Sequence, residues 1–301
     1  MTERDDPLAA HRGRLLGLAY RMLGSRADAE DVLQDAYLRF RSRDPDGIRN
    51  VEAFLVTTVT RLCLDRLKSA RARREVYVGP WLPEPVLDGE ALSPETAVEI
   101  ADDLSFALML TLERLTAPER AAFLLHDVFD APFSQIAESL GKSEAACRQL
   151  AVRARKAVRG ARPSRPASPE AHAVLLKHFA EALSTGDASR LEALLTADAV
   201  AYTDGGGVKV AALNPITGAD RVARFFAGLV RKNRVRGGRT EFKTARINGA
   251  PGFVVYLDGA LDQTLSIEVR EDRIAGIYIV RNPEKLAAVA AVLAQSGRSV
   301  S

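Results

Sequence analysis

The chain has few cysteines and histidines, and its sequence contains no recognisable metal-binding motif. Its 301 residues include two cysteines, Cys63 and Cys147, one tryptophan and four histidines. The two thiols fall in helical patterns, and their spacing matches neither a zinc site nor a disulfide framework. We therefore expect no metal, no cofactor and two reduced thiols.

Long apolar runs are also missing. No uninterrupted hydrophobic stretch approaches the length of a membrane span, and the start of the chain, Met1 to Leu8, is acidic and polar. These absences predict a cytoplasmic protein with no secretory signal and no membrane partner, monomeric when free. A net charge of +3 is only mildly basic, so the partners must be inferred from where the charge lies.

One long stretch has no positive charge at all. Residues 75–113 contain neither lysine nor arginine, although the chain has 42 such residues. Four prolines between residues 80 and 94 exclude a continuous helix up to Ser93. We predict an acidic linker over 75–104, leading into a helix that begins near Ser93. A second, proline-rich linker is predicted over 163–169.

The linkers separate two helical blocks from a mixed block. Residues 1–74 and 105–162 have helical spacing, and 170–301 form the mixed block. Within it, 171–183 and 188–195 are predicted helices. Four segments bounded by glycine alternate as strands do: 240–247, 253–257, 264–269 and 274–280. Helices followed by an antiparallel meander predict an α+β domain.

The second helical block has the pattern of a helix-turn-helix. Ser134 to Leu140 gives a short first helix, Gly141 the turn, and Ser143 the cap of a second, basic helix. Arginine and glutamine are the side chains that best pair with guanine and adenine edges. The first turns of the second helix would expose Ser143, Glu144, Ala145, Arg148, Gln149 and Arg153. A plain helical hairpin with a basic face remains the alternative.

Basic residues accumulate at the end of each helical block. Residues 142–165 carry eight basic side chains opposed only by Glu144, which favours contacts with DNA phosphates. Residues 61–74 carry six, opposed by Asp65. This second cluster lies at a helix C-terminus, where positive charge also suits the helix dipole, so both explanations stay open.

Two segments resemble the extracytoplasmic-function sigma factors. They are DAEDVLQDAYLRF at 28–40 and LTAPER at 115–120. The resemblance implies that the first block binds core RNA polymerase and the minus-ten element of promoter DNA, that the helix-turn-helix binds the minus-thirty-five element, and that the acidic linker threads the polymerase's RNA path. It assigns polymerase binding to Asp31, Asp35 and Arg39, minus-ten DNA to Arg49, Asn50, Arg61, Arg66 and Lys68, and minus-thirty-five DNA to Ser143, Glu144, Arg148, Gln149 and Arg153.

Three further motifs are similar to those of SigJ-type sigma factors with a SnoaL-like extension: WLPEP at 81–85, DGGG at 204–207 and NPEKL at 282–286. The implied fold is multidomain: two all-α sigma domains, the second a helix-turn-helix, and an α+β SnoaL-like cone domain. An interdomain regulatory role is expected for Trp81, Leu82, Pro83, Glu84, Pro85, Asp204, Gly205, Gly206, Gly207, Asn282, Pro283, Lys285 and Leu286.

We therefore expect a sigma factor that directs promoter-specific initiation and is modulated by its own C-terminal domain. Two alternatives remain: a self-standing helix-turn-helix regulator that senses a small ligand, and a cone-fold enzyme with a DNA-binding appendage. We assign no catalytic residue, and a small ligand in the C-terminal pocket stays open. Asp204 and its three glycines are explained most simply as a conformationally free turn. The polar residues available to an active site would be Tyr202, Asp204, Tyr256, Asp258 and Glu268.

Overall fold

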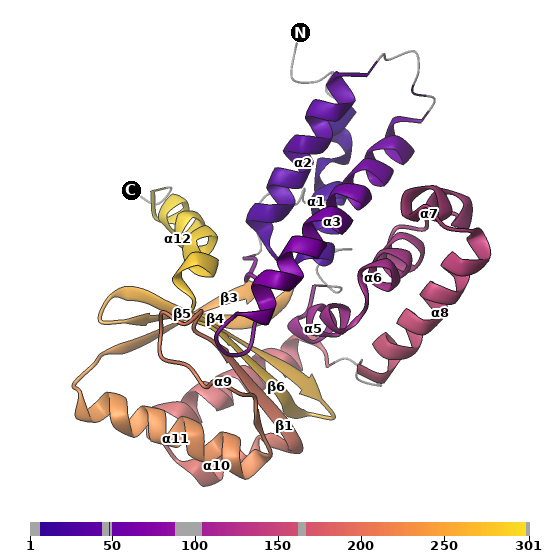
Figure 1. Ribbon diagram of the computed structural model, residues 1–301. Helices are drawn as coiled ribbons and strands as arrows, with labels where there is room; N and C mark the ends of the chain where they lie inside the picture. The colour runs from indigo at the N-terminus through magenta and orange to yellow at the C-terminus, as the bar shows by residue number, and fades with distance from the viewer. Residues whose placement is uncertain (1–6, 44–47, 49, 88–103, 162–166, 299–301) are drawn as a thin grey trace. The chain divides into compact units, whose positions relative to one another are not determined.

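The computed structural model describes residues 7–43, 48, 50–87, 104–161 and 167–298, and they divide into two compact units (Figure 1). The first unit holds the described parts of 1–76 and 108–162, and the second those of 77–107 and 163–301 that remain. Arg49 and the start of the predicted helix near Ser93 lie outside the described residues. No helix in the described part of the chain is long and apolar enough to span a membrane.

Three long helices open the first unit: α1 (Pro7–Leu23), α2 (Arg26–Arg41) and α3 (Val51–Glu75). The Ser25 hydroxyl caps α2 by accepting a hydrogen bond from the Asp28 amide at 3.1 Å. The buried face of α2 is formed by Ala29, Val32, Leu33 and Ala36. Burial of this face leaves the opposite face of α2, with its acidic side chains, exposed to solvent.

The next helix, α5 (Phe106–Arg114), begins in the second unit and lies in the first from Leu108 on. The remaining helices of the first unit are α6 (Ala117–Phe123), the π-helical turn η3 (Leu124–Val128), α7 (Phe133–Leu140) and α8 (Glu144–Ala161). Thr116 and Glu119 form the capping box of α6. Gly141 ends α7 with a φ of +62°, a left-handed conformation that glycine adopts without strain. α7, this turn and α8 form the predicted helix-turn-helix.

The second unit is built on a mixed six-stranded sheet. Its strands are β1 (Leu195–Asp204), β2 (Ile216–Thr217), β3 (Thr240–Ile247), β4 (Ala250–Leu257), β5 (Ala260–Arg270) and β6 (Arg273–Val280), in the order β2-β1-β6-β5-β4-β3. β3 to β6 form the predicted antiparallel meander. Two-residue turns with positive φ join these strands at 248–249, 258–259 and 271–272, a geometry whose twist matches that of the flanking strands.

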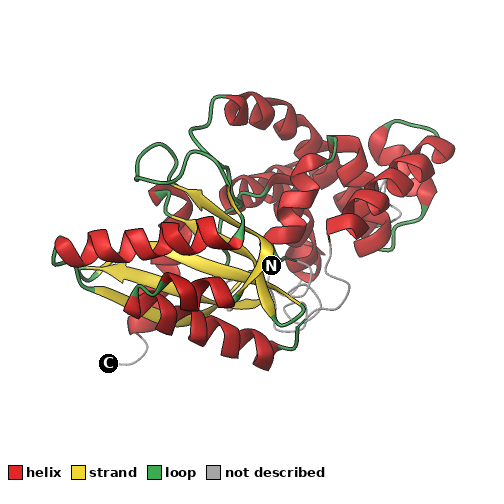
Figure 2. Cartoon of the chain, turned by 90° about the horizontal axis from the view of Figure 1, so that it is seen from below, coloured by secondary structure: helices red, strands yellow, loops and turns green. Residues whose placement is uncertain are grey.

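Helices cover one face of the sheet: α9 (Pro169–Thr185), α10 (Ala188–Ala193) and α11 (Ala219–Val235), seen from below in Figure 2. Their core contains an edge-to-face pair, Phe179 and Phe226, packed with the inward strand residues Val255, Ile267 and Ile277. α12 (Pro283–Arg298) follows β6. Because successive residues of a strand point to opposite faces of a sheet, the neighbours of these core residues face the other side, where another part of the unit can pack.

Two details of the mixed block differ from the prediction. The helix predicted over 188–195 ends at Ala193, and Leu195 already begins β1, which pairs in parallel with β6. The sheet is therefore mixed rather than a pure meander. β1 contains three alanines, which have low strand propensity, so its conformation depends on tertiary pairing rather than on local sequence. α11 and α12 were not predicted.

Candidate functional site

The exposed face of α2 carries the residues expected to bind polymerase. Asp31, Asp35 and Arg39 are all exposed and lie one helical turn apart. Arg66 of α3 faces the two acids: its guanidinium is 3.2 Å from Asp31 and 3.7 Å from Asp35. It also lies 2.9 Å from Asp28. The structure thus places Arg66, expected at the minus-ten element, among the carboxylates of the expected polymerase face.

The other residues expected at the minus-ten element do not form one cluster. The Asn50 side chain caps α3 by accepting from the Ala53 amide at 2.9 Å, and Lys68 pairs with Asp65 at 2.8 Å. Arg61 donates to the Glu138 carbonyl at 2.6 Å. Asn50 therefore has a local structural task, whereas Lys68 is fully accessible on the surface of α3.

Within the first unit, α3 packs against α7, the first helix of the helix-turn-helix. The hydroxyls of Thr57 and Ser139 lie 3.1 Å apart in a buried contact. Arg61 adds its hydrogen bond to Glu138 at the rim. The face of α3 that carries Thr57 is consequently covered in this arrangement, and its exposure requires α7 to move.

The first turns of α8 present the expected base-reading side chains to solvent. Ser143 caps the helix through the Ala146 amide at 3.2 Å, and Glu144, Arg148 and Gln149 are exposed. Arg148 pairs with Glu144 at 2.6 Å and lies over the Phe133 ring, 5.1 Å from its centroid. Surface pairs of this kind contribute at most about 1 kcal/mol, so DNA can displace them easily.

Arg153, one turn further along α8, is oriented by α6. It donates to Glu119 at 2.8 Å, and Glu119 also accepts from the Thr116 hydroxyl at 2.7 Å. The Thr116 hydroxyl above all, and then Arg153, holds the pKa of Glu119 below its ordinary value. Glu119 therefore stays ionised and keeps the Arg153 guanidinium near α6, although the Arg153 side chain is 61% exposed.

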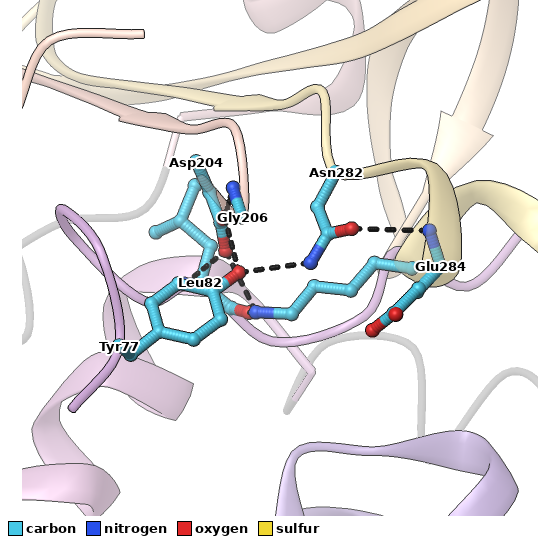
Figure 3. A network of polar contacts seen from close by, with 7 residues as sticks. Tyr77, Leu82, Asp204, Gly206, Asn282 and Glu284 are labelled. Atoms are coloured by element: carbon cyan, nitrogen blue, oxygen red, sulfur yellow. Dashed lines mark hydrogen bonds and ion pairs between the residues drawn. The ribbon is translucent and has the colours of Figure 1, made fainter. Parts of the chain in front are cut away.

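The most buried polar site of the second unit is centred on Asp204, at the end of β1 (Figure 3). Asp204 is 0% exposed, and its carboxylate accepts hydrogen bonds from the Tyr77 hydroxyl at 2.6 Å and from the Leu82 amide at 2.9 Å. The Lys285 ammonium lies 2.7 Å away. We call these residues the Asp204 site. Its donors come from the linker and from α12, and their acceptor lies at the end of β1, so three segments far apart in sequence meet here.

The linker supplies three of the groups that surround the Lys285 ammonium. Its ammonium donates to the Leu82 carbonyl at 2.5 Å and lies 4.2 Å from the centroid of the Trp81 ring and 4.8 Å from that of Tyr77. Aromatic faces stabilise a desolvated cation, so the two rings and the Asp204 carboxylate together replace the water that Lys285 loses. The predicted motifs 81–85, 204–207 and 282–286 are brought together here.

The first two glycines after Asp204 are needed for close approach. A β-carbon at Gly205 would lie 2.1 Å from the Lys209 carbonyl oxygen, and one at Gly206 would lie 2.4 Å from the Asn282 amide. Asn282 in turn donates to the Tyr77 hydroxyl at 2.9 Å. The earlier interpretation of Asp204 as part of a free turn is wrong, because its side chain is buried and ionically paired.

Tyr77 was missed by the sequence analysis. Burial, first of all, and then its hydrogen bond to Asp204 raise the pKa of the phenol above its ordinary value, so the hydroxyl remains a donor. The only sequence signal was its position four residues before Trp81. Of the other expected residues here, Pro83, Pro85 and Leu286 are buried, Glu84 is half-buried and Pro283 is exposed.

A separate apolar groove of about 740 Å³ lies between α9 and the β3–β4 hairpin. Its lining includes Leu176, Phe242 and Phe253. The five polar residues expected of an active site, Tyr202, Asp204, Tyr256, Asp258 and Glu268, are absent from the lining of this groove. No cluster of three or more candidate metal ligands occurs among the described residues.

Both helical blocks match known protein families. Residues 8–73 match Sigma-70 region 2 and residues 105–158 match Sigma-70 region 4. The chain is 40% identical over 288 residues to the ECF RNA polymerase sigma factor SigJ of Mycobacterium tuberculosis, covering 92% of this chain and 91% of SigJ. It is 32% identical to the probable ECF sigma factor SigI of that organism, covering 93% and 95%.

The likeness extends to the three-dimensional structure. The crystal structure of M. tuberculosis SigJ matches with a TM-score of 0.74 at 38% identity, covering 92% of this chain and 96% of that one. The match therefore includes the C-terminal unit, whose mixed sheet and helices are consistent with a SnoaL-like fold. Together the two sigma regions and the full-length likeness show that this chain belongs to the extracytoplasmic-function sigma factors of RNA polymerase.

Proposed function

We propose that this sigma factor engages core RNA polymerase through the exposed face of α2 and reads promoter DNA through α3 and the first turns of α8. Its C-terminal unit modulates that activity by holding the linker. Exposure of Asp31 and Asp35 supports the first assignment, and exposure of Arg148 and Gln149 supports the last. The alternative of a catalytic C-terminal unit loses its best candidate, because Asp204 is already neutralised by Lys285.

The single observation that carries the regulatory proposal is the Asp204 site. A linker that must enter the polymerase is instead bound at Tyr77, Trp81 and Leu82 by groups of the C-terminal unit. The buried Lys285 and Asp204 charges are paired with each other, so separating the linker from this site must not leave either charge buried without a partner. Polymerase must therefore either accept the docked linker or replace these contacts, and both routes couple promoter activity to the C-terminal unit.

Transcription from a promoter library, with purified core polymerase and the full chain, tests this proposal. Tyr77→Phe removes a hydroxyl and Trp81→Ala removes the aromatic ring over Lys285, and both variants keep the Asp204–Lys285 ion pair. We expect each to change transcript output at least threefold. Tyr256→Phe, on β4 away from the linker, is the control and should leave output unchanged. Wild-type output from both linker variants would refute modulation through this site.

The polymerase-binding face is tested by charge reversal. Asp31→Lys with Asp35→Lys should abolish capture of core polymerase, because both carboxylates are exposed on one side of α2. Arg66 retains Asp28 as a partner, which protects the fold. Glu30→Lys, also exposed on α2, serves as the control. Undiminished capture by the double variant, with an unchanged helix signal, would place the polymerase face elsewhere.

A further inference from the structure

One residue of the β3–β4 turn, Asn248, is buried, although hairpin turns normally face solvent. Three turns of the same two-residue type join β3 to β6. At the β4–β5 turn, Asp258 and Gly259 are exposed, and at the β5–β6 turn so are Glu271 and Asp272. Asn248 of the β3–β4 turn is only 2% exposed. What buries it is the linker, so this turn has a binding partner that the other two lack.

Asn248 makes two hydrogen bonds to Val86, a linker residue shortly before the acidic segment 88–103. The side-chain oxygen of Asn248 accepts from the Val86 backbone amide at 3.0 Å, and the backbone amide of Asn248 donates to the Val86 carbonyl at 2.8 Å. Next to it, Leu87 and Ile247 form an antiparallel bridge. The linker thus adds a short piece of strand to the end of the hairpin, a main-chain mode of peptide binding.

The same side chain also holds the segment after the acidic stretch. The Asn248 side-chain nitrogen donates to the Leu104 carbonyl at 3.0 Å. Two residues on, the Phe106 ring stacks on Tyr278 of β6 at 5.4 Å, and Tyr278 stacks on Tyr202 of β1 at 5.7 Å. One amide therefore binds both chain ends that flank residues 88–103.

The geometry fixes the separation of these ends. The Val86 nitrogen and the Leu104 oxygen each lie 3.0 Å from a terminal atom of one amide group. Standard bond lengths then keep them within about 8 Å of each other. The 19 residues from Val86 to Leu104, if fully extended, could separate these two atoms by up to about 65 Å. Asn248 thus keeps Val86 and Leu104, which lie between the first sigma block and the helix-turn-helix in sequence, much closer together than the chain between them requires.

We propose that Asn248 is a latch that binds both ends of the acidic linker segment and must open before polymerase can take that segment up. This inference rests on the proposed function, because it assumes that the linker enters the polymerase. It differs from the Asp204 site in residues, in location and in effect. The Asp204 site binds the segment before Pro83, whereas the latch sets the distance across residues 88–103.

Two substitutions of Asn248 separate its two side-chain hydrogen bonds. Asn248→Gly keeps the positive φ of the turn, 52°, but removes both side-chain contacts. Asn248→Asp keeps an acceptor for Val86 but replaces the donor to Leu104 with a carboxylate oxygen, which repels the Leu104 carbonyl. By amide hydrogen exchange of the full chain, the Gly variant should exchange faster both at Val86 and at residues 105–107. The Asp variant should exchange faster only at 105–107.

The matched control is Asp258→Gly, which makes the same change in the exposed β4–β5 turn. It should leave exchange at Val86 and at residues 105–107 unchanged. If Asn248→Gly also leaves exchange there unchanged, the latch does not exist. That result would not touch the proposed function, whose test uses Tyr77 and Trp81.

Polymerase affinity tests the regulatory part. Because the latched state is incompetent to deliver the segment, losing two side-chain hydrogen bonds should raise the affinity of the full chain for core polymerase about tenfold. Wild-type Val86 should also exchange faster in the holoenzyme than in the free chain. Unchanged affinity of Asn248→Gly, or continued protection of Val86 in the holoenzyme, would overturn the latch. Threefold effects of Tyr77→Phe and Trp81→Ala in that case would leave the proposed function standing.

Discussion

The first turns of α8 and the Asp204 site use the same kinds of charge in opposite ways. On α8, the Arg148 side chain is 55% exposed and its pairing with Glu144 is local. At the Asp204 site, the Lys285 side chain is 8% exposed, Asp204 is fully buried, and their contact joins residues 81 positions apart. The Arg148 guanidinium on α8 is therefore accessible to a new binding partner. The Lys285 ammonium is instead enclosed by its partners within the protein.

The difference teaches which charges bind a partner and which hold a conformation. A solvated ion pair contributes about 0–1 kcal/mol and is screened by salt, so phosphate or base edges can replace it. A buried pair that loses one member leaves an uncompensated charge, which costs about 3–5 kcal/mol. Substitution should therefore alter affinity on α8 and stability at the Asp204 site.

The largest effect is expected for Asp204→Asn. It should destabilise the second unit by about 3–5 kcal/mol, because the Lys285 charge stays buried without its counter-charge. Denaturant unfolding followed by the fluorescence of the single tryptophan, Trp81, measures this loss. Asp198→Asn, which breaks the exposed pair with Arg270, should cost less than about 1 kcal/mol. Equal losses in the two variants would remove the distinction between the sites.

Removing both charges should be less harmful than removing one. In the double variant Asp204→Asn with Lys285→Met, no buried charge is left unpaired, and we expect a coupling of about 1–3 kcal/mol in a double-mutant cycle. The same cycle on Glu144 and Arg148 should give less than about 0.5 kcal/mol, since both side chains are solvated. A larger coupling on α8 than at the Asp204 site would reverse the comparison.

The α8 side of the comparison is sharpened by two arginines. Arg148→Ala should weaken binding to the preferred minus-thirty-five sequence by about 1–3 kcal/mol and relax the preference at one position. Arg159→Ala, further along α8, should weaken binding to all sequences alike and lower the salt dependence. Binding of the holoenzyme to a set of single-base promoter variants, at two salt concentrations, distinguishes them. Sequence-blind losses for both would make Arg148 a phosphate contact.

The smallest effect is a dependence on alkaline pH at the Asp204 site. The pKa of Tyr77 is raised in the folded state, first by burial and then by Asp204. Its contribution to stability is therefore complete below the ordinary tyrosine pKa of about 10 and is lost as the pH rises above it. Unfolding between pH 8 and 11 should show a steeper decline for the wild type than for Tyr77→Phe. Parallel declines would remove Tyr77 as the titrating group.

The sequence predicted elements that local chemistry determines. Both helical blocks, the helix-turn-helix with Gly141 at its turn, and the four strands of the meander follow from periodicity, capping residues and glycine-containing turns. β1 was missed, since an alanine-containing segment takes its conformation from pairing with β6. The sequence motifs that contain Trp81, Asp204 and Lys285 were identified, but not the ion pair itself, because a contact between residues 204 and 285 leaves no local pattern.

Asn248 shows the same limit at a single residue. Asn-Gly between two strands is the strongest short hairpin signal, and it explains the turn fully. Its second task, binding Val86 and Leu104, depends on residues 162 and 144 positions away. A residue that already has a sufficient local explanation gives no sign in the sequence that it also binds elsewhere.

The wide sequence separation at the Asp204 site has a consequence for the newly synthesised chain. Lys285 follows its linker partner Leu82 by 203 residues. At bacterial translation rates of about 5–20 residues per second, the linker leaves the ribosome some 10 to 40 seconds before Lys285 does. In the later part of that interval, after residue 162 has been made, both sigma blocks are complete while the linker has no α12 to bind. A nascent chain on a polysome, or one cleaved before α12, therefore presents a linker that lacks the Lys285 contacts of the finished protein.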